Sequence, residues 1–209
     1  QHEGVFAAVG IQPNYAAEAA EGDWERIVAL VERARVVAIG ETGLDRHWDY
    51  TPFDLQQQCF ERHLRLAQQC GLPVIVHCRE AEDDVMAALH DAAERGPLRG
   101  VLHAFSGELD MADECIELGL HVSFAGPVTY QNKKFDALRE AVVAVPDERL
   151  LIETDSPYLV PHPLRGKLKR NEPCHVRLVA EALAELRGQP LEHVAAVTAQ
   201  NARRLFGIE

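Results

Sequence analysis

Four residues of the kinds that bind divalent metals stand at the ends of short apolar runs. They are Glu41, His77, His103 and Asp155. Each lies at or just after the end of an apolar segment, for example Val74-Ile75-Val76 before His77 and Leu151-Ile152 shortly before Asp155. Imidazole and carboxylate groups together form the ligand set of hydrolytic metal sites, where the ion polarises a phosphoryl or carbonyl oxygen and lowers the pKa of a water molecule. The chemistry that these residues indicate is metal-assisted hydrolysis.

Each of the four has an ordinary structural explanation when taken alone. A histidine after an apolar strand is more often a hydrogen-bonded core or rim residue, and a lone acid there usually caps a turn or a helix. Four such residues in corresponding places favour a metal site. Four other histidines are better explained by solvated or structural roles: His63, His90, His121 and His193. For His47 a surface-loop position is as plausible as a place in the site.

Short β-branched runs alternate with longer segments of helical spacing, which predicts βα repetition and a parallel sheet. The expected strands are 5–11, 35–40, 73–78, 100–104, 121–124 and 150–154. The expected helices are 23–34, 53–70, 80–95, 110–118, 133–143, 173–187 and 191–206, with Gly188 and Gly207 as stop signals for the last two.

The strands are apolar almost to their last residues, as in sheets covered by helices on both faces. In a closed parallel barrel the carboxyl ends of the strands carry the active site. We therefore expect an α/β fold of the TIM-type (β/α)8 barrel, here with only about six of the eight strands. Residues 1–209 are expected to form one domain.

Composition limits the classes of function. The chain has 209 residues, 47% hydrophobic and 26% charged, and no apolar run approaches the roughly 20 residues that cross a bilayer. Neither membrane association nor a secretory signal is predicted, so we expect a cytoplasmic protein. The five scattered cysteines predict no disulfide framework. A net charge of −12 argues against a broad nucleic-acid-coating surface but permits a small nuclease site, where a metal ion supplies local positive charge.

One basic stretch, Arg165 to Arg170, departs from the acidic balance. A solvated loop is its plain interpretation, and a phosphate clamp is the functional one, favoured because the stretch follows the Asp155 strand. Asn171 is expected to cap the helix whose first turn contains Pro173.

Several segments together resemble the TatD family of metal-dependent deoxyribonucleases. They are Val9-Gly10-Ile11, Gly40-Glu41-Thr42-Gly43-Leu44-Asp45, Val76-His77-Cys78-Arg79, His103-Ala104-Phe105-Ser106-Gly107, Glu153-Thr154-Asp155-Ser156-Pro157-Tyr158, Arg170-Asn171-Glu172-Pro173 and Asn201 to Phe206. The resemblance covers the whole chain. It implies an amidohydrolase-like barrel with one or two divalent cations, Mg, Mn or Zn, and phosphodiester hydrolysis on DNA ends, with RNA as a possible substrate. Glu41, His77, His103 and Asp155 would be the metal ligands, Asp155 and Glu41 would be catalytic, and Gln12, Arg79, Arg170 and Asn171 are candidates for substrate or phosphate contacts.

Two departures from the family pattern matter. No H-x-H pair occurs, and the segment Val5 to Ile11 resembles the family's third strand, so two strands with their helices are expected to be absent. Because the chain begins with Gln1, we interpret it as N-terminally truncated or incomplete and not as a six-stranded fold. Gln12 stands where the family usually has histidine, and an amide cannot exchange a proton as an imidazole does. We expect the gap to uncover Val9, Ile11, Leu151 and Ile152, and the chain alone to aggregate, to pair through its open edges or to need the missing segment.

Three hypotheses follow. In the first, Glu41, His77 and His103 hold one ion while Asp155 orients or deprotonates the attacking water of a nuclease. In the second, the same site hydrolyses a small amide, ester or phosphotriester, since one barrel serves many chemistries. In the third, the chain is an inactive remnant, which need not bind metal. Oligomeric state is left open.

Overall fold

The computed structural model describes residues 3–208, so Gln1, on which the expectation of a missing segment partly rests, lies outside the described part. The chain divides into two compact units. The first comprises the chain up to Leu102, the short stretch Leu118–Leu120 and the residues from Leu205 onward. The second comprises His103–Glu117 and His121–Arg204.

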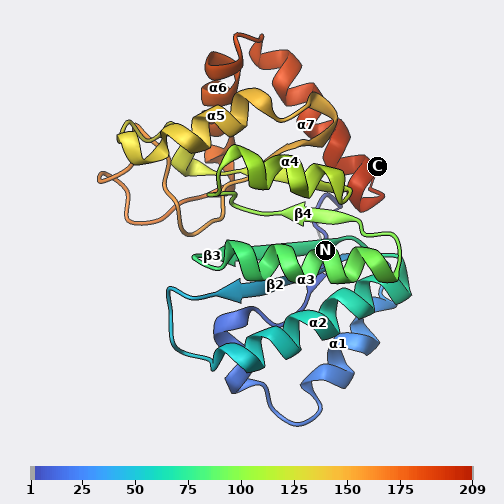
Figure 1. The fold of residues 1–209 in the computed structure, drawn as a ribbon. Helices are drawn as coiled ribbons and strands as arrows, with labels where there is room; N and C mark the ends of the chain where they lie inside the picture. Colours follow the sequence, from blue (N-terminus) through green and yellow to red (C-terminus); the bar gives the residue numbers. More distant parts are fainter. Residues whose placement is uncertain (1–2, 209) are drawn as a thin grey trace. The chain divides into compact units, whose positions relative to one another are not determined.

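The first unit carries most of the strands and three helices. Its elements are β1 (Ala7–Val9), η1 (Pro13–Glu18), α1 (Asp23–Val31), β2 (Val36–Asp45), α2 (Phe53–Cys70), β3 (Val74–Arg79), α3 (Glu82–Arg95) and β4 (Gly100–Leu102). Helix α1 packs on β1 and β2, α2 packs on β2 and β3, and α3 packs on the same two strands (Figure 1). The apolar faces of these amphipathic helices thus cover the strands that carry Glu41 and His77.

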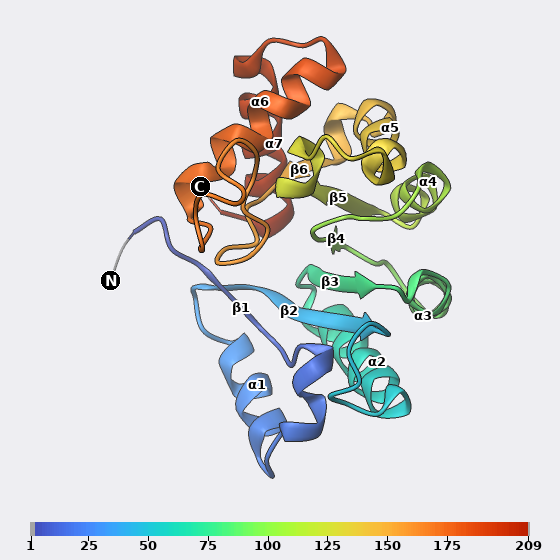
Figure 2. The ribbon, with the colours of Figure 1, turned by 90° about the vertical axis from the view of Figure 1, so that its left-hand side faces the viewer.

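The second unit is mainly helical. Its elements are α4 (Leu109–Glu117), β5 (Leu120–Phe124), η2 (Gly126–Thr129), η3 (Lys133–Phe135), α5 (Asp136–Ala144), η4 (Asp147–Arg149), β6 (Leu150–Ile152), η5 (Pro173–His175), α6 (Val176–Arg187) and most of α7 (Leu191–Phe206). Helix α5 contacts both α4 and α6, and α6 packs on β6 (Figure 2).

The strands follow one another in sequence order, β1-β2-β3-β4-β5-β6. The pairs β1–β2, β2–β3, β3–β4 and β5–β6 are parallel. Successive strands are joined through helices, as parallel connections require. The expectation of an α/β fold with six parallel strands is confirmed, whereas the single-domain assignment stays a prediction.

The largest difference from the expected elements is in β2, which runs to Asp45 instead of ending at Gly40. Its second half stays paired with β3, where Thr42 is opposite Val76 and Asp45 is opposite Arg79. Glu41 therefore lies inside a strand and does not follow one. The polar residues of this segment favoured a strand that ends at Gly40. The strand continues because backbone pairing does not depend on side-chain polarity.

Other bounds differ less. The strands β1, β4 and β6 are shorter than expected, α1 ends at Val31, α3 begins at Glu82, and a 3-10 turn precedes each of α5 and α6. Helices α2 and α7 have the expected bounds. Helix α6 ends at Gly188, whose φ of 61° is the left-handed value that glycine adopts without strain.

The side chains expected to be uncovered have different surroundings. Val9, Ile11 and Ile152 are half-buried, but Leu151 is only 5% exposed, contrary to expectation. All five cysteines are in the described part and none forms a disulfide. No helix within residues 3–208 is long and apolar enough to cross a membrane.

Candidate metal centre

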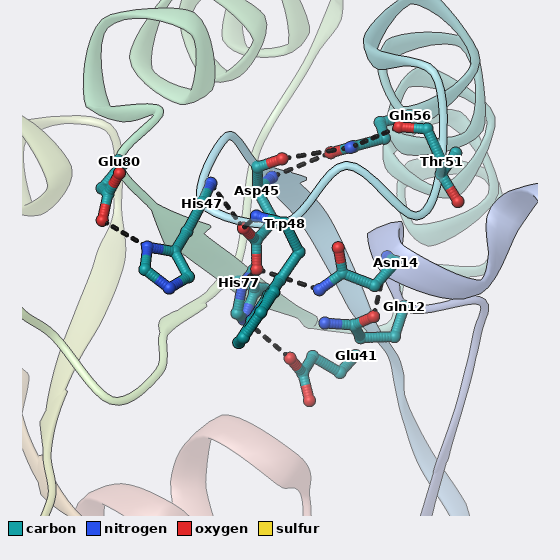
Figure 3. A network of polar contacts seen from close by, with 10 residues as sticks. All are labelled: Gln12, Asn14, Glu41, Asp45, His47, Trp48, Thr51, Gln56, His77 and Glu80. Carbon is teal, nitrogen blue, oxygen red and sulfur yellow. Dashed lines mark hydrogen bonds and ion pairs between the residues drawn. The ribbon is translucent and has the colours of Figure 1, made fainter.

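In the first unit, His77 lies between two carboxylates of the neighbouring strand. Its Nδ1 is 2.9 Å from Glu41 Oε1, and its Nε2 is 3.0 Å from Asp45 Oδ2 (Figure 3). The parallel pairing of β2 with β3 places Gly43 opposite His77, so Glu41 and Asp45 reach the ring from either side of that position. The sheet register therefore brings these three side chains together.

The protonation of this group follows from Asp45, which is 1% exposed. Burial alone would raise the pKa of its carboxyl group, but hydrogen bonds from His77, Asn14 and the backbone of Trp48 outweigh burial and lower the pKa to about 2. An ionised Asp45 only accepts, so His77 Nε2 carries a hydrogen, and Nδ1 is the nitrogen that faces Glu41. Two electron-rich atoms 2.9 Å apart need a proton or a cation between them.

Asp45 is itself held in place by a buried amide. Gln56, on α2, accepts a hydrogen bond from Asp45 N at 2.8 Å and donates to Asp45 O at 3.1 Å. The same amide donates to Thr51 O at 3.0 Å, and Asn14 donates to Asp45 Oδ2 at 2.9 Å. Gln56 is 1% exposed, so its bonds are shielded from water; they hold the backbone of Asp45, while Asn14 holds the carboxylate that faces His77.

Gly43 allows β2 and β3 to approach closely at this point. A Cβ atom on Gly43 would lie 2.0 Å from His77 O, and the φ of Gly43 is 141°. Both the space and the backbone conformation require glycine. The second glycine of the Gly40-to-Asp45 segment thus sets the position of His77.

The second unit contains its own group of ligand atoms. His103 follows β4, while Glu153 and Asp155 follow β6, and one ligand atom from each lies within 4.8 Å of the others. His103 Nδ1 is 3.1 Å from Glu153 Oε1. Asp155 has a φ of 53° and Ala104, next to His103, has a φ of 44°. Such left-handed residues mark sharply turned backbone, which often carries functional side chains.

Both groups fit a divalent cation by their chemistry. Bonds of about 2.0 to 2.2 Å from imidazole and carboxylate place donor atoms about 3 to 4 Å apart. The 2.9 Å pair of Glu41 and His77 and the 3.1 Å pair of His103 and Glu153 have this composition and spacing, and Asp155 offers a third ligand atom within 4.8 Å of the second pair. The prediction that Glu41, His77 and His103 share one ion combines residues of both units and stays a prediction.

Sequence reasoning missed Asp45 and Glu153. Both stand in the segments that carry the resemblance, Asp45 at the end of Gly40-to-Asp45 and Glu153 before Thr154-Asp155. The predicted strand ends at residue 40, so the prediction leaves Asp45 outside the sheet. A simple signal was available for Glu153, since residues i and i+2 of extended chain project to the same side.

The phosphate candidates have varied surroundings. Gln12 caps η1, accepting a hydrogen bond from Asn14 N at 2.8 Å, and Arg79 and Arg170 are exposed. Asn171 is 1% exposed, and its amide donates to Thr154 O at 2.8 Å and Leu159 O at 3.3 Å. These bonds indicate that Asn171 holds the segment that contains Asp155 in place.

The expected helix cap at Asn171 was wrong. Glu172 is the N-cap of η5, and its side chain and that of His175 form reciprocal capping bonds. The side-chain oxygen of Asn171 instead accepts from Glu172 N at 2.9 Å. Of the other histidines, His63 is fully buried and accepts from Ile11 N at 3.0 Å, and His47 Nδ1 is 2.7 Å from Glu80 on an exposed loop.

Parallel strands that carry histidine and carboxylate side chains towards or just beyond their carboxyl ends are typical of metal-dependent hydrolases. The profile of the family described as TatD related DNase matches residues 1–207. The chain is 43% identical to an uncharacterized metal-dependent hydrolase, YabD, of Bacillus subtilis, over all of this chain and 80% of that protein. It is 38% identical to the 3′-5′ ssDNA/RNA exonuclease TatD of Citrobacter rodentium, over 97% of this chain and 77% of that protein.

A solved structure agrees with these sequence relatives. The structure of YJJV, a TatD homolog from Escherichia coli K12, superposes with a TM-score of 0.91 at 30% identity, covering all of this chain and 79% of that one. The chain therefore belongs to the TatD family of metal-dependent hydrolases.

Proposed function

We propose that this protein is a metal-dependent nuclease that hydrolyses phosphodiester bonds, acting as a deoxyribonuclease on DNA ends. The observation that carries the proposal is the pair of histidine–carboxylate groups, one in each unit, with donor atoms spaced for a divalent cation. The relative from Citrobacter rodentium, named a 3′-5′ ssDNA/RNA exonuclease, supports nucleic acid as the substrate class and makes that polarity the first to test.

A bound divalent ion, Mg, Mn or Zn, would supply the positive charge that polarises the phosphoryl oxygen and acidifies a water molecule. In this proposal Glu41, His77 and His103 are its ligands, and one or two ions bind per chain. Asp45 keeps Nδ1 of His77 directed at Glu41. Asp155 orients the attacking water and accepts its proton, which a carboxylate beside the bound ion can do.

The remaining residues would position the substrate. Arg79 and Arg170 have exposed guanidinium groups that suit phosphate oxygens. Gln12 offers an amide next to η1, while the buried Asn171 would act through the backbone of the Asp155 segment. We further propose a cytoplasmic enzyme, since five cysteines without a disulfide suit a reducing compartment.

The test uses the chain stripped of metal by a chelator and then given Mg²⁺, Mn²⁺ or Zn²⁺. Single-stranded DNA and RNA labelled at either end report substrate and polarity, and a panel of small amides, esters and phosphotriesters is measured in parallel. Asp155→Asn should abolish metal-dependent DNA cleavage, whereas Asp110→Asn, at an exposed site on α4, should not.

The outcomes separate the alternatives. Metal-dependent release of nucleotides that requires Asp155 supports the nuclease. Turnover of the small substrates without DNA cleavage would replace it with another hydrolase. A chain that binds no metal by elemental analysis and cleaves nothing would be inactive, and the proposal would be wrong.

A further inference from the structure

Two large aromatic rings lie exposed and stacked on the loop that follows β2. The rings of Trp48 and Tyr50 are nearly parallel, with an interplanar angle of 11° and centroids 5.3 Å apart. Trp48 is 41% exposed and Tyr50 is 61% exposed. Contiguous exposed apolar surface often marks a binding site, and here two adjacent rings are stacked together rather than scattered.

The loop is attached to the candidate metal centre through one carboxylate. Asp45 Oδ1 accepts hydrogen bonds from His47 N at 2.9 Å and Trp48 N at 3.0 Å. The other oxygen of the same carboxylate holds His77 (Figure 3). The backbone of Trp48 is therefore hydrogen-bonded to Asp45, the same carboxylate that orients the candidate ligand His77.

The far end of the loop is fixed as well. Gln56 binds both Asp45 and Thr51, on either side of the exposed rings. Thr51 Oγ1 also accepts from Ala17 N at 3.2 Å, and Thr51 is 3% exposed. A loop pinned at both ends presents its aromatic pair with little loss of freedom on binding, which favours affinity.

Positive charge accompanies the rings. The Arg79 guanidinium carbon is 5.6 Å from the Trp48 ring centroid, and Arg79 ends β3 just beyond His77. The two neighbouring basic groups are engaged, Arg46 with Asp84 at 2.8 Å and His47 with Glu80 at 2.7 Å. Arg79 is therefore the guanidinium that we assign to a ligand beside the aromatic pair.

We infer that Trp48 and Tyr50 are a stacking platform for the bases of single-stranded nucleic acid, with Arg79 contacting the phosphate that follows. Base faces are available in single strands and covered in a duplex, so the platform selects the unpaired strand. A chain of net charge −12 gains little from a broad electrostatic surface, so uncharged stacking contributes more of the affinity. The inference rests on the proposed nuclease function and specifies the substrate.

Binding is measured apart from cleavage, by fluorescence anisotropy of a labelled twelve-residue oligothymidylate in the presence of a chelator. Tyr50→Ala should weaken binding about ten-fold, the effect of losing one aromatic stacking partner. Tyr50→Phe should bind as the unchanged chain does, since the ring face remains. Tyr15→Ala removes another exposed tyrosine, 59% exposed on η1, and should have no effect.

Further ligands and readouts define the platform. An abasic strand of equal length and a duplex should both bind weakly, and their binding should not depend on Tyr50. Arg79→Gln should reduce the salt dependence of binding by about one phosphate contact. Because the sequence has two tryptophans, quenching of Trp48 fluorescence by the oligonucleotide is read in a Trp24→Phe background. Unchanged Mn²⁺ affinity in Tyr50→Ala shows that the centre is intact.

The failure of this inference can be told from failure of the proposed function. Oligonucleotide binding that is equal in Tyr50→Ala, or equal for the abasic strand, overturns the platform even if DNA is cleaved. Tyr50-dependent binding by a chain that cleaves no DNA with any metal supports the platform and overturns the nuclease.

Discussion

The imidazole of His77 is held by the buried carboxylate of Asp45, with Nε2 3.0 Å from Oδ2. Because Asp45 is ionised, Nε2 carries a hydrogen in this contact, and Nδ1 is the ring nitrogen that faces Glu41. The position of Asp45 behind the ring is that of an outer carboxylate which supports a metal-binding histidine.

Asp45→Asn should therefore weaken metal binding about 10- to 100-fold, the usual effect of losing such a partner. An asparagine amide in this place points a donor at the His77 hydrogen or at the Asn14 amide, so the ring loses its orientation. Isothermal titration with Mn²⁺ measures the affinity. Asp84→Asn, which loses only the contact with Arg46, is the matched control. Equal affinities in both variants would show that Asp45 does not position His77.

His103→Ala should remove a ligand and cut DNA hydrolysis strongly while changing stability little. His103 follows the carboxyl end of β4, where residues of parallel-barrel enzymes serve chemistry more than packing. Metal content, end-labelled DNA cleavage and thermal unfolding are compared with His90→Ala, at an exposed position of α3. Retained activity with normal metal content, or loss of cooperative unfolding, would contradict this assignment.

Stability should fall as the pH drops below about 6.5 because of His63. Burial lowers the pKa of this imidazole, partly offset by its hydrogen bond to Cys59 O at 2.7 Å. Below the unfolded pKa of about 6.5 the unfolded chain binds a proton that the folded chain does not, so the contribution is complete above that pH and is lost towards the lower folded pKa.

The measurement is the free energy of urea unfolding between pH 7.5 and 5. One proton gives a slope of at most about 1.4 kcal/mol per pH unit. His63→Gln removes this titration and should have a shallower slope than the unchanged chain. Parallel slopes would mean that His63 does not contribute to the pH dependence.

Asp147 should stabilise the second unit through Arg187. Arg187, 8% exposed, donates to Asp147 at 2.6 Å and to the carbonyls of Val142 and Val145. Asp147→Asn leaves a buried guanidinium without its counter-ion, and we expect a loss of about 1 to 3 kcal/mol in thermal or urea unfolding. Asp136→Asn, which breaks the exposed pair with Arg139, should cost less than about 1 kcal/mol.

The loss of stability at low pH gives a second measurement of the same interaction. A hydrogen bond with His193, followed by those with Gln189 and Arg187, lowers the pKa of Asp147 below 3.8. Its contribution is therefore present above about pH 4 and disappears as the pH falls through the folded pKa. Asp147→Asn should be less sensitive to pH in this range, and an unchanged loss of stability at low pH would refute the coupling.

The sequence predicted the βα order, the parallel pairing and two helices with their bounds because apolar periodicity records which faces are buried. It failed at β2, where Glu41 to Asp45 continue the strand with mixed polarity. Periodicity cannot report a strand whose side chains serve a site, since their polarity is set by chemistry and not by the core.

The side chains of Glu41 and His77 lie together because they project from adjacent, paired strands, although the sequence placed Glu41 after its strand; their role as ligands stays a prediction. Asp45 was missed since its role depends on register. Only the close approach at Gly43 determines which side of the ring it reaches. The prediction of a helix cap at Asn171 was wrong. The amide of Asn171 instead bonds Thr154 and Leu159, and contacts between segments distant in sequence are not visible in local sequence patterns.

The amide of Gln56 satisfies the N–H and C=O of Asp45 and the carbonyl of Thr51, so the chain between them is closed by a residue only eleven positions from Asp45. The side chains of Trp48 and Tyr50 at the exposed tip take no part in that closure, and the tip is bonded to Asp45 through the backbone N–H groups of His47 and Trp48. Substitutions at the tip can therefore accumulate without disturbing the histidine and carboxylates behind it. Substrate preference and catalytic geometry can diverge independently within this segment, and grafting a different tip is a route to altered specificity on an unchanged metal centre.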